Sequence, residues 1–577
     1  MFTRVLIANR GEIALRVARA CRELDIGVVA AYSTADRESA WVGMADEAVH
    51  IGPAAARRSY LNIPALIEAA HRSGADAIHP GYGFLSEDQD FAEICAAEGV
   101  TFIGPSPEVM HRVCDKSRVR TLMADAGLPL LPGSVEPVRS VAAGARMAAD
   151  IGFPVIIKAV AGGGGRGMSV VRAADDFAAA FTRTQSDARA LFGCPDVYLE
   201  RYLAAARHVE VQVLADGDGR GIHLGERECS IQRRQQKLLA ESPCPELDDQ
   251  QRTQLGEMAV AGALSVGLTG AGTMEFLLDE SGGLYFMELN ARIQVEHPVT
   301  EMITGIDIVR EQILISAGAA LQYTQSDIRL MGAAMECRVN AEDPARGFAP
   351  APGTLTRFIP PAGPWTRVET GYRQGDRVNA HYDSLMAKVV VWAPDRSQAI
   401  RRMDRALGEF EVSGPGVATT LTLHRNLLRS GVFRRGLCTT SYLERHLPEL
   451  IEPAPIGMPD RDRPLRHRSS IAQIRAVAHP PQSKGVRPMA TTHFAVSDLM
   501  ELLTEKAGLP RHKHTADPDA TLDDVGLDSL AFLAIQCGLE QRYGFSLPNE
   551  GPTYCSTVGD IAGEVDARLQ RAEAPTS

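Results

Sequence analysis

The chain has 577 residues, 45% of them hydrophobic and 23% charged, so it is long enough for several domains with well-filled cores. Its net charge of −12 gives no reason to expect nucleic acid as a partner. The ten cysteines include no CxxC pair, and no run approaches 18 apolar residues. We therefore expect a cytoplasmic protein without a disulfide framework, a zinc site or a membrane span.

The first 115 residues alternate short strands with amphipathic helices, an order that predicts a doubly wound α/β sheet. The expected elements are a strand Val5–Ala8, a helix through Leu15 and Arg19, a strand Val28–Tyr32 and a third strand ending at His79. No GxGxxG motif is present, so a dinucleotide site is not supported. The loop His79–Glu87 follows the third strand, where such sheets place ligand contacts, although its turn-forming residues fit a tight turn equally well.

Four consecutive glycines, 162–165, lie between two predicted strands, Pro154–Lys158 and Ser169–Val171. Glycine lets the backbone approach a phosphate chain and turn its N–H groups inward. A glycine run can also be a mobile linker, but strands directly on both sides favour a lid. The run is not a P-loop, because no GK[ST] follows it.

Further segments follow along the chain. Val197–Leu203 changes direction before an alternating strand, His208–Leu214. Cys229–Lys237 is polar and basic, which suits anion binding but also a solvated surface. Taken singly, Lys158 and Lys237 could be ordinary surface lysines.

Two apolar runs, Thr273–Leu278 and Leu284–Glu288, are joined by five turn-forming residues and predict a β-hairpin. Folding the hairpin symmetrically sets Glu275 opposite Glu288. Opposed like charges destabilise a sheet, whereas a divalent cation between them reverses the sign of the interaction. The hairpin therefore predicts a site for Mg²⁺ held against substrate phosphates.

The run from Glu288 to Glu296 alternates polar and apolar residues, so five polar side chains would share one face of an extended strand. An amphipathic strand with one face in water is the alternative, and the neighbouring hairpin argues against it. A fully extended run would span roughly 26 Å, too long for one metal and one small anion. We therefore expect a bend near Arg292 between two adjoining half-sites.

Seven motifs occur in one order along the chain: Ala8–Ala14, His79–Glu87, Lys158–Met168, Gln232–Lys237, Glu288–Glu301, Glu336–Pro344 and Tyr382–Ser384. In sequence and order they resemble biotin carboxylase, an ATP-grasp enzyme, over about residues 1–447. The resemblance implies a doubly wound N-terminal domain (1–115), a central and glycine-rich lid region (116–204), and an ATP-grasp core with a mixed α+β C-terminal domain (205–447). It also implies that the chain activates bicarbonate with ATP and carboxylates the ureido nitrogen of biotin.

The resemblance assigns roles to the residues that match. It implies that ATP and the other cofactors are bound by Lys116, Lys158, Gly164, Gly165, Glu200, Arg201, Tyr202, Leu203, His208, Gln232, Gln235, Glu275 and Glu288. Mg²⁺ or Mn²⁺ would be held by Glu275, Glu288 and Asn290. Bicarbonate would be positioned by Lys237, Arg292, Gln294 and Val295. Glu296 would remove its proton, and Arg338 would stabilise the enolate-like form of biotin.

Two positions depart from the family pattern. Gln235 stands where many members have histidine near the nucleotide ribose. Glutamine still donates and accepts hydrogen bonds, so we expect an altered nucleotide affinity with the chemistry retained. Ala161 replaces the first glycine of longer runs, which should matter little. Every metal, base and bicarbonate position is intact, which argues against a non-catalytic relative.

The composition changes after residue 447. Residues 453–488 contain seven prolines and a net charge of +5, whereas residues 489–577 carry −8. We therefore expect a Pro/Arg-rich linker (448–488) and a small acidic module (489–577). The module has three predicted helices: Val496–Leu503, Ser529–Tyr543 and Val558–Leu569.

The string Gly526–Leu530 opens the second of these helices, and Leu539–Pro548 follows. With the module's size, acidity and helix order, they resemble an acyl carrier protein, a small all-α four-helix bundle. The resemblance implies 4′-phosphopantetheine on Ser529, attached by a phosphopantetheinyl transferase. A helix N-cap is the alternative reading of Ser529 and the aspartate before it.

The chain contains no Met-Lys-Met and no region resembling a carboxyltransferase. We therefore expect biotin on a separate biotin carboxyl carrier protein and a separate carboxyltransferase. The expected whole is an acyl-CoA or acyl-carrier carboxylase that makes malonyl-type units, with a homodimer formed through the biotin carboxylase part. Two alternatives remain: another ATP-grasp ligase with a non-biotin acceptor, and a non-catalytic scaffold for the carrier.

Overall fold

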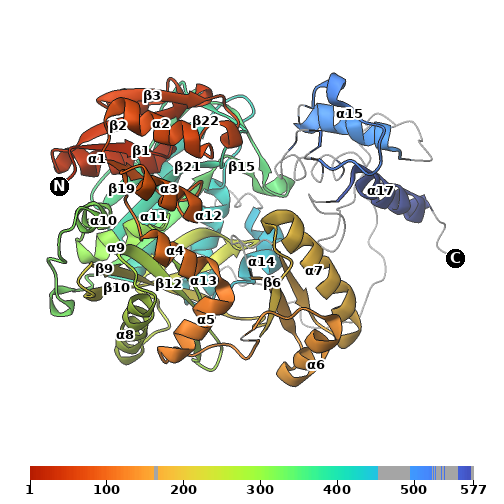
Figure 1. The fold of residues 1–577 in the computed structure, drawn as a ribbon, viewed down its shortest axis with the longest axis horizontal. Helices are drawn as coiled ribbons and strands as arrows, with labels where there is room; N and C mark the ends of the chain where they lie inside the picture. Colours follow the sequence, from red (N-terminus) through yellow and green to blue (C-terminus); the bar gives the residue numbers. More distant parts are fainter. Residues whose placement is uncertain are drawn as a thin grey trace. The chain divides into compact units, whose positions relative to one another are not determined.

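The computed structural model describes residues 1–134, 136–160, 167–451, 494–507, 509–522, 524, 525, 527, 535, 539 and 556–573. They form a large unit, within Met1–Pro344 and Pro350–Met458, and a smaller C-terminal unit. Figure 1 shows the large unit as sheets flanked by helices. Among the described residues, none of the helices combines the length and apolar character needed to cross a membrane.

The N-terminal sheet has five parallel strands in the order β3-β2-β1-β4-β5. Their bounds are β1 (Arg4–Ile7), β2 (Gly27–Ser33), β3 (Glu47–Gly52), β4 (Ala77–His79) and β5 (Thr101–Phe102). Helices α1 (Gly11–Glu23), α2 (Ile63–Ser73) and α3 (Gln89–Ala97) connect them. Alternate residues of β1 and β2 enter two different cores, one on each face, so the predicted doubly wound sheet is confirmed.

One detail of that prediction is wrong. The strand ending at His79 is the fourth, because β3 precedes it in the chain. β3 lies at the edge of the sheet and buries only Val49 and Ile51. An edge strand with so few buried residues lacks the continuous apolar run by which a buried parallel strand is recognised.

An eight-stranded sheet forms the centre of the large unit, in the order β13-β12-β9-β10-β11-β14-β21-β19. The bounds are β9 (Arg207–Ala215), β10 (Gly221–Arg233), β11 (Gln236–Ser242), β12 (Gly270–Leu278), β13 (Leu284–Asn290), β14 (Ala333–Asn340), β19 (Thr366–Thr370) and β21 (Leu385–Ala393). Every residue of β9 is buried. The polar residues that alternate along this strand therefore point into the protein and not into water.

Helices α8 (Asp249–Ser265), α9 (His297–Thr304), α10 (Ile308–Ser316) and α11 (Arg396–Glu409) pack on this sheet. Further helices of the large unit are α4 (Pro107–Cys114), α5 (Lys116–Asp125), α12 (Leu421–Arg429), α13 (Gly431–Arg434) and α14 (Tyr442–Ile451). Short strands complete it: β15 (Glu342–Asp343), β16 (Ala349–Pro350), β17 (Gly353–Thr354), β18 (Arg357–Ile359), β20 (Arg377–Val378) and β22 (Glu411–Ser413).

A separate three-stranded sheet carries the segment predicted to be a lid. Its order is β7-β6-β8, with β6 (Val155–Ala159), β7 (Met168–Val171) and β8 (Val197–Arg201), and α6 (Val141–Ile151) and α7 (Phe177–Phe192) pack on it. β6 and β7 are antiparallel, with Lys158 paired to Met168. The glycine run between them, including Ala161, Gly164 and Gly165, lies outside the described residues.

The C-terminal unit contains α15 (Val496–Ala507) and α17 (Val558–Glu573), which correspond to the first and third predicted helices. The two helices pack on one another through a core that includes Leu499, Leu503, Ile561 and Val565. Ser529 and most of the second predicted helix lie outside the described residues. The four-helix arrangement therefore remains a prediction.

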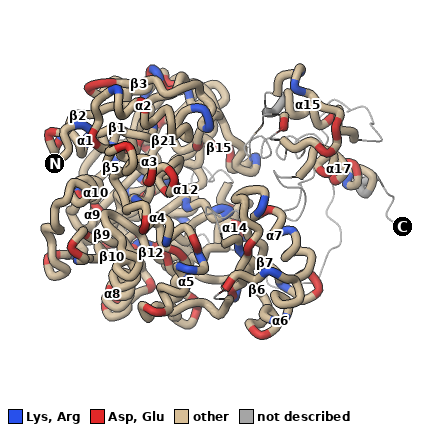
Figure 2. Tube along the Cα trace, in the orientation of Figure 1, with Lys and Arg blue, Asp and Glu red and all other residues tan. Residues whose placement is uncertain are grey.

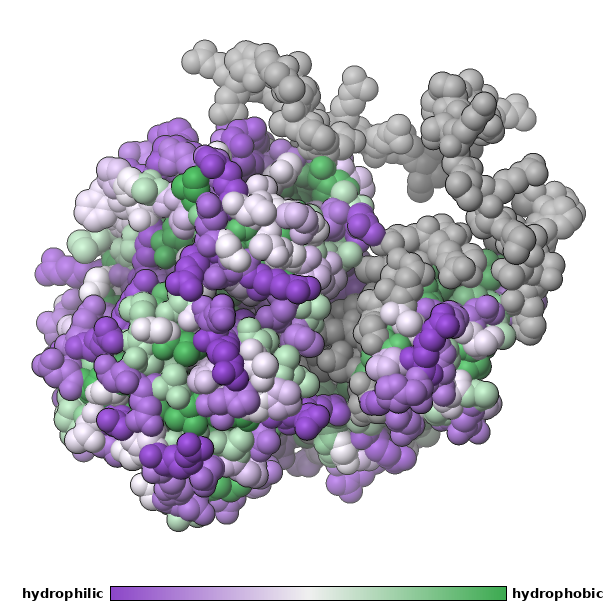
Figure 3. Space-filling view, turned by 90° about the horizontal axis from the view of Figure 1, so that it is seen from above, coloured by the Kyte–Doolittle hydropathy of each residue, from purple (hydrophilic) through white to green (hydrophobic). Residues whose placement is uncertain are grey.

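Charged residues of both signs are interleaved along the described helices and strands (Figure 2). The face of the large unit seen in Figure 3 likewise mixes hydrophilic and hydrophobic residues. Charges that are buried are more informative, because an ionised group is almost never fully buried unless it is paired. One group of such charges lies on β9, β10, β11, β12 and the loop after β13.

Candidate active site

Three glutamates form a row across adjacent strands of the central sheet. Glu275 of β12 pairs with Glu288 of β13 on one side and with Glu210 of β9 on the other. The predicted pairing of Glu275 with Glu288 is confirmed, and a register shift directly after Glu275 sets it. The sequence analysis did not single out Glu210, although Glu210 occupies a polar position of the strand predicted at His208–Leu214.

Two cations, Arg227 and Lys237, balance the negative charge of this row. Arg227 of β10 is fully buried, and its Nε lies 2.6 Å from Glu210. Lys237 of β11 contacts Glu210 and lies 2.9 Å from Glu275 and 2.8 Å from Glu296. Burial alone would lower the pKa of Lys237, but the three carboxylates raise it well above its ordinary value. Lys237 is thus a charged interior residue, not a surface lysine.

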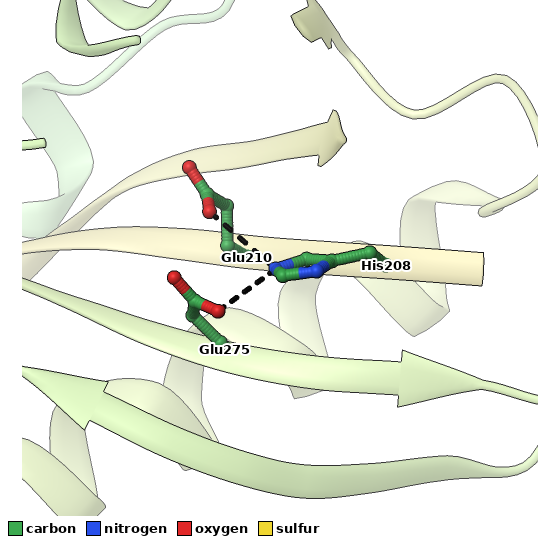
Figure 4. A group of neighbouring side chains, drawn as sticks. All are labelled: His208, Glu210 and Glu275. Carbon is green, nitrogen blue, oxygen red and sulfur yellow. Dashed lines mark ion pairs between the residues drawn. The ribbon is translucent and has the colours of Figure 1, made fainter. Parts of the chain in front are cut away.

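His208 completes the group and stands between two carboxylates, as Figure 4 shows. Its Nε2 lies 3.0 Å from Glu275 and 3.7 Å from Glu210. Burial lowers the pKa of His208, but Glu275 and Glu210 outweigh that effect and raise it to about 9. The imidazole is therefore protonated at neutral pH and can donate a hydrogen bond to an anion.

Oxygen donors for a hard cation are grouped on the same hairpin. Asn290 ends β13, and its Nδ2 donates to Glu275 across 2.9 Å. Burial raises the pKa of Glu275, but Lys237 and His208 lower it by more, to below its ordinary value. The carboxylate is therefore ionised. Two carboxylates and an amide oxygen fit Mg²⁺, which prefers oxygen ligands and is usually bound by one or two carboxylates beside phosphates.

The segment after β13 bends at Arg292, as predicted, and α9 begins at His297. The alternative of a strand with one face in water is wrong, because Asn290, Gln294 and Glu296 are all buried. Gln294 donates to Glu275 across 3.0 Å, so the two half-sites adjoin. Arg292 reaches Glu87 at 3.1 Å, which brings the predicted loop His79–Glu87 to the site.

Glu296 is fully buried between two cations from different strands. Lys237 lies 2.8 Å from one carboxylate oxygen, and Arg338 of β14 lies 2.6 Å from the other. Burial raises the pKa of Glu296, but Lys237 and Arg338 outweigh burial and a neighbouring glutamate and hold it below the ordinary value. The carboxylate is therefore ionised and able to accept a proton.

A second polar group lies on the three-stranded sheet. Lys158 is 9% exposed, and its Nζ lies 2.5 Å from Glu200, which also contacts Arg120. Arg201 follows Glu200 but turns its guanidinium to the carbonyl of Ile151 at 3.4 Å. Tyr202 and Leu203 follow at the end of the segment predicted to change direction, and both are half-buried. Lys116, the first residue of α5, lies 3.6 Å from Glu288 of the central sheet.

The divergent glutamine lies in a strained turn. Arg234 and Gln235 connect β10 to β11 and have φ angles of 46° and 66°, a region that favours glycine or asparagine. Gln235 is exposed, whereas Gln232 is buried and pairs with Lys237 across the strands. Gln235 therefore lies at the exposed turn between β10 and β11, and Lys237 lies two residues further along the chain in β11.

One buried carboxyl group was given no role by the sequence analysis, although it opens the recognised motif Glu336–Pro344. Glu336 of β14 is fully buried, and neither of its carboxylate oxygens has a hydrogen-bond partner among the described residues. Burial raises the pKa of Glu336 to about 8, against the opposing effects of Lys388 and Arg338. Glu336 is therefore mostly protonated at neutral pH.

This shift predicts a pH-dependent effect of Glu336→Gln on stability. The folded-state pKa lies above the ordinary value of 4.5, so stability present below pH 4.5 is lost as the pH rises towards 8. Glutamine mimics the protonated acid. The variant should therefore gain stability relative to the unmodified chain, by at most about 1.4 kcal/mol per pH unit in that window.

Thermal unfolding between pH 5 and pH 8 measures this difference. Glu280→Gln, at the exposed tip of the β12–β13 hairpin, is the matched control and should show no such trend. A difference between Glu336→Gln and the unmodified chain that stays constant over the window would contradict the expectation.

Comparison with known proteins gives a family for each part of the chain. Residues 1–110 match the biotin carboxylase N-terminal domain, residues 115–324 the ATP-binding domain of the carbamoyl-phosphate synthase L chain, and residues 336–445 the biotin carboxylase C-terminal domain. Residues 497–565 match the phosphopantetheine attachment site. Biotin carboxylases of Nostoc sp. and Bacillus subtilis are 51% and 49% identical over 443 and 447 residues, in each case 77% of this chain and 99% of the relative.

Solved structures show the same similarity. The biotin carboxylase domain dimer of Hydrogenobacter thermophilus 2-oxoglutarate carboxylase, in complex with MgADP, ADP and bicarbonate, has a TM-score of 0.76 and 47% identity, covering 79% of this chain and all of that one. A Campylobacter jejuni biotin carboxylase in a β-γ-ATP complex has a TM-score of 0.76 and 47% identity, covering 77% and 99%. The chain belongs to the biotin carboxylase family of ATP-dependent ligases and carries a phosphopantetheine attachment domain in its C-terminal part.

Proposed function

We propose that the chain uses ATP and bicarbonate to carboxylate biotin on a separate biotin carboxyl carrier protein. The observation that carries the proposal is the fully buried carboxylate of Glu296 between Lys237 and Arg338. A base held between two cations suits an anionic substrate that must lose a proton. In this proposal bicarbonate lies on the Lys237 side and the biotin ureido group on the Arg338 side.

The residues act on each reactant in turn. Lys116, Lys158 and His208 hold the phosphates of ATP, and Arg292, Gln294 and the Val295 backbone orient bicarbonate. Glu275, Glu288 and Asn290 hold Mg²⁺, which offsets phosphate charge when bound. Glu296 takes the bicarbonate proton, and a bicarbonate oxygen attacks the γ-phosphorus, releasing ADP. The carboxyphosphate breaks to CO₂ and phosphate. The released phosphate takes the proton of the ureido N–H of biotin, and the resulting nitrogen anion, stabilised by Arg338, attacks CO₂.

The proposal is tested by ADP release with and without each substrate. Free biotin and bicarbonate together should accelerate ADP release many-fold over either one alone, because carboxyphosphate forms only with bicarbonate and discharges productively only onto biotin. A chain that accelerates with another amine and ignores biotin would be a different ATP-grasp ligase. A chain without bicarbonate-dependent ADP release would be a non-catalytic scaffold, and either result would overturn the proposal.

For the C-terminal domain we propose that Ser529 carries 4′-phosphopantetheine, attached by a phosphopantetheinyl transferase, and that the arm holds an acyl group. Support comes from the match to the phosphopantetheine attachment site, whose range includes Ser529. The acyl group that we propose is malonyl-type, formed with a separate carboxyltransferase. Relatives of similar identity belong to a pyruvate carboxylase of Methanothermobacter thermautotrophicus and to a 2-oxoglutarate carboxylase. The biotin carboxylase half therefore does not indicate which acyl group is carboxylated, and the choice of a malonyl-type group is supported by the carrier domain.

Ser529→Ala should abolish modification of the chain by a phosphopantetheinyl transferase and coenzyme A, because the hydroxyl is the attacking group. Intact-mass measurement reads the result directly. Ser546→Ala, in the same module, is the control and should still gain the full mass increment. Unchanged modification of Ser529→Ala would contradict the assignment.

We also propose a homodimer formed by the biotin carboxylase part. Support comes from the Hydrogenobacter thermophilus relative, whose biotin carboxylase domain is a dimer. Light scattering of the chain should therefore give twice the mass of one protomer.

A further inference from the structure

A fully buried ammonium lies behind the loop that carries Glu296. Lys388 is 0% exposed and stands in β21, within the otherwise apolar run Leu385–Ala393. Its Nζ donates to the carbonyl oxygen of Val295 across 2.9 Å and lies 3.0 Å from a carboxylate oxygen of Glu12. A lysine is almost never buried to this degree without partners, so these two contacts hold it there.

The register of the sheet places this lysine beside the cation that contacts the base. Lys388 is directly opposite Arg338 in the antiparallel pair β14–β21. Opposed residues project from the same face of a sheet. Arg338 contacts the carboxylate of Glu296, while Lys388 holds the backbone carbonyl of the preceding residue, Val295. Neighbouring cations on neighbouring strands thus fix two consecutive residues of one loop.

The counter-charge of Lys388 comes from α1, the helix that follows the first strand of the N-terminal sheet. Glu12 is 6% exposed and also accepts a hydrogen bond from the hydroxyl of Tyr82, whose ring centroid lies 5.8 Å from the Lys388 Nζ. The first turn of α1 packs closely on Gly371, where a Cβ would lie 2.6 Å from the carbonyl carbon of Gly11. This close packing leaves Glu12 little freedom to move away from the ammonium.

Glu296 precedes the first residue of α9 but makes no side-chain capping bond. Its carboxylate is therefore free to face the two cations, provided that the backbone before the helix is held. We infer that Lys388 is a positioning residue for the base: through the carbonyl of Val295, and with Glu12 as its counter-charge, it orients the Val295–Glu296 segment towards bicarbonate. This inference rests on the proposed function.

The alternative is that Lys388 and Glu12 only stabilise the fold. Two variants distinguish a positioning role from a purely structural one. Lys388→Met should lower kcat for biotin-dependent ADP release by about 10- to 100-fold, the effect of a small misplacement of a reacting group. Its KM for ATP should change by less than about threefold. The variant should also melt earlier, because Glu12 remains as a buried charge without its partner.

The double variant Lys388→Met/Glu12→Gln removes both charges, and glutamine still accepts from Tyr82. Replacing both members of a buried pair is often neutral for stability, so the melting temperature should return towards that of the unmodified chain. The kcat should stay low, because the Val295 carbonyl still lacks its donor. Arg396→Met/Glu241→Gln, at an ion pair of 2.6 Å elsewhere in the large unit, is the matched control and should keep its kcat.

Recovery of both melting temperature and kcat in the Lys388→Met/Glu12→Gln variant would overturn the inference and leave a structural role only. The same holds if Lys388→Met keeps its full kcat. An unmodified chain without bicarbonate- and biotin-dependent ADP release would instead overturn the proposed function, and this inference with it. The two failures are therefore told apart by the activity of the unmodified chain.

Discussion

Glu296→Gln should lower kcat for bicarbonate- and biotin-dependent ADP release by about 10²- to 10⁴-fold, the usual contribution of a positioned base. Glutamine keeps the size and can still accept a hydrogen bond, but it cannot take the proton of bicarbonate. Both cations that contact Glu296 stay in place, and the oxygen donors of the metal site are untouched. Stopped-flow or coupled measurement of ADP at saturating substrates gives the change in kcat.

Nucleotide binding is the control for Glu296→Gln. The dissociation constant of MgADP, measured by calorimetry, should change by less than about threefold, because the contacts of Lys116, Lys158 and His208 remain. A kcat within about fivefold of that of the unmodified chain would show that Glu296 is not the base. A variant that loses nucleotide binding as well would mean that Glu296 acts through the fold of the site.

Lys237→Met should destabilise the large unit by about 3–5 kcal/mol in the absence of ligands. Glu210, Glu275 and Glu296 all lie around the Nζ of Lys237, and removing the ammonium leaves buried carboxylates without their common partner. The activity should fall at the same time, because this ammonium also faces the proposed bicarbonate position. Chemical denaturation measures the stability.

A compensating variant distinguishes this cause from simple loss of packing. Lys237→Met/Glu210→Gln removes one buried negative charge and should recover part of the lost stability without recovering activity. Lys513→Met, in a short 3-10 turn of the C-terminal unit, is the control and should leave the stability of the large unit unchanged. Equal stability of Lys237→Met and the unmodified chain would contradict the charge balance described for the site.

Short-range patterns in the sequence predicted the fold well. The turn-forming residues between two apolar runs were sufficient to predict the β12–β13 hairpin and its opposed pair, Glu275 and Glu288. The length of the alternating run was sufficient to predict the bend at Arg292. The edge strand β3 was missed because burial of two residues leaves too weak a pattern.

Long-range partners could not be predicted in the same way. Lys388 and Val295 are 93 residues apart, and nothing local indicates that their atoms meet. A signal was nonetheless present, because a lone lysine in the apolar run Leu385–Ala393 must be paired when the strand is buried. Glu210 likewise stood in a recognised strand, but an alternating pattern alone does not tell a wet face from a buried polar one.

Transfer of oxygen from bicarbonate to phosphate tests the central claim most directly. If a bicarbonate oxygen attacks the γ-phosphorus of ATP, ¹⁸O-labelled bicarbonate should deliver one labelled oxygen to each phosphate released in the presence of biotin. Mass spectrometry of the phosphate reads the label, and Glu296→Gln should reduce the rate at which it appears. In the converse experiment the label is in water and not in bicarbonate. Phosphate that takes its new oxygen from the labelled water would show plain ATP hydrolysis and contradict the account.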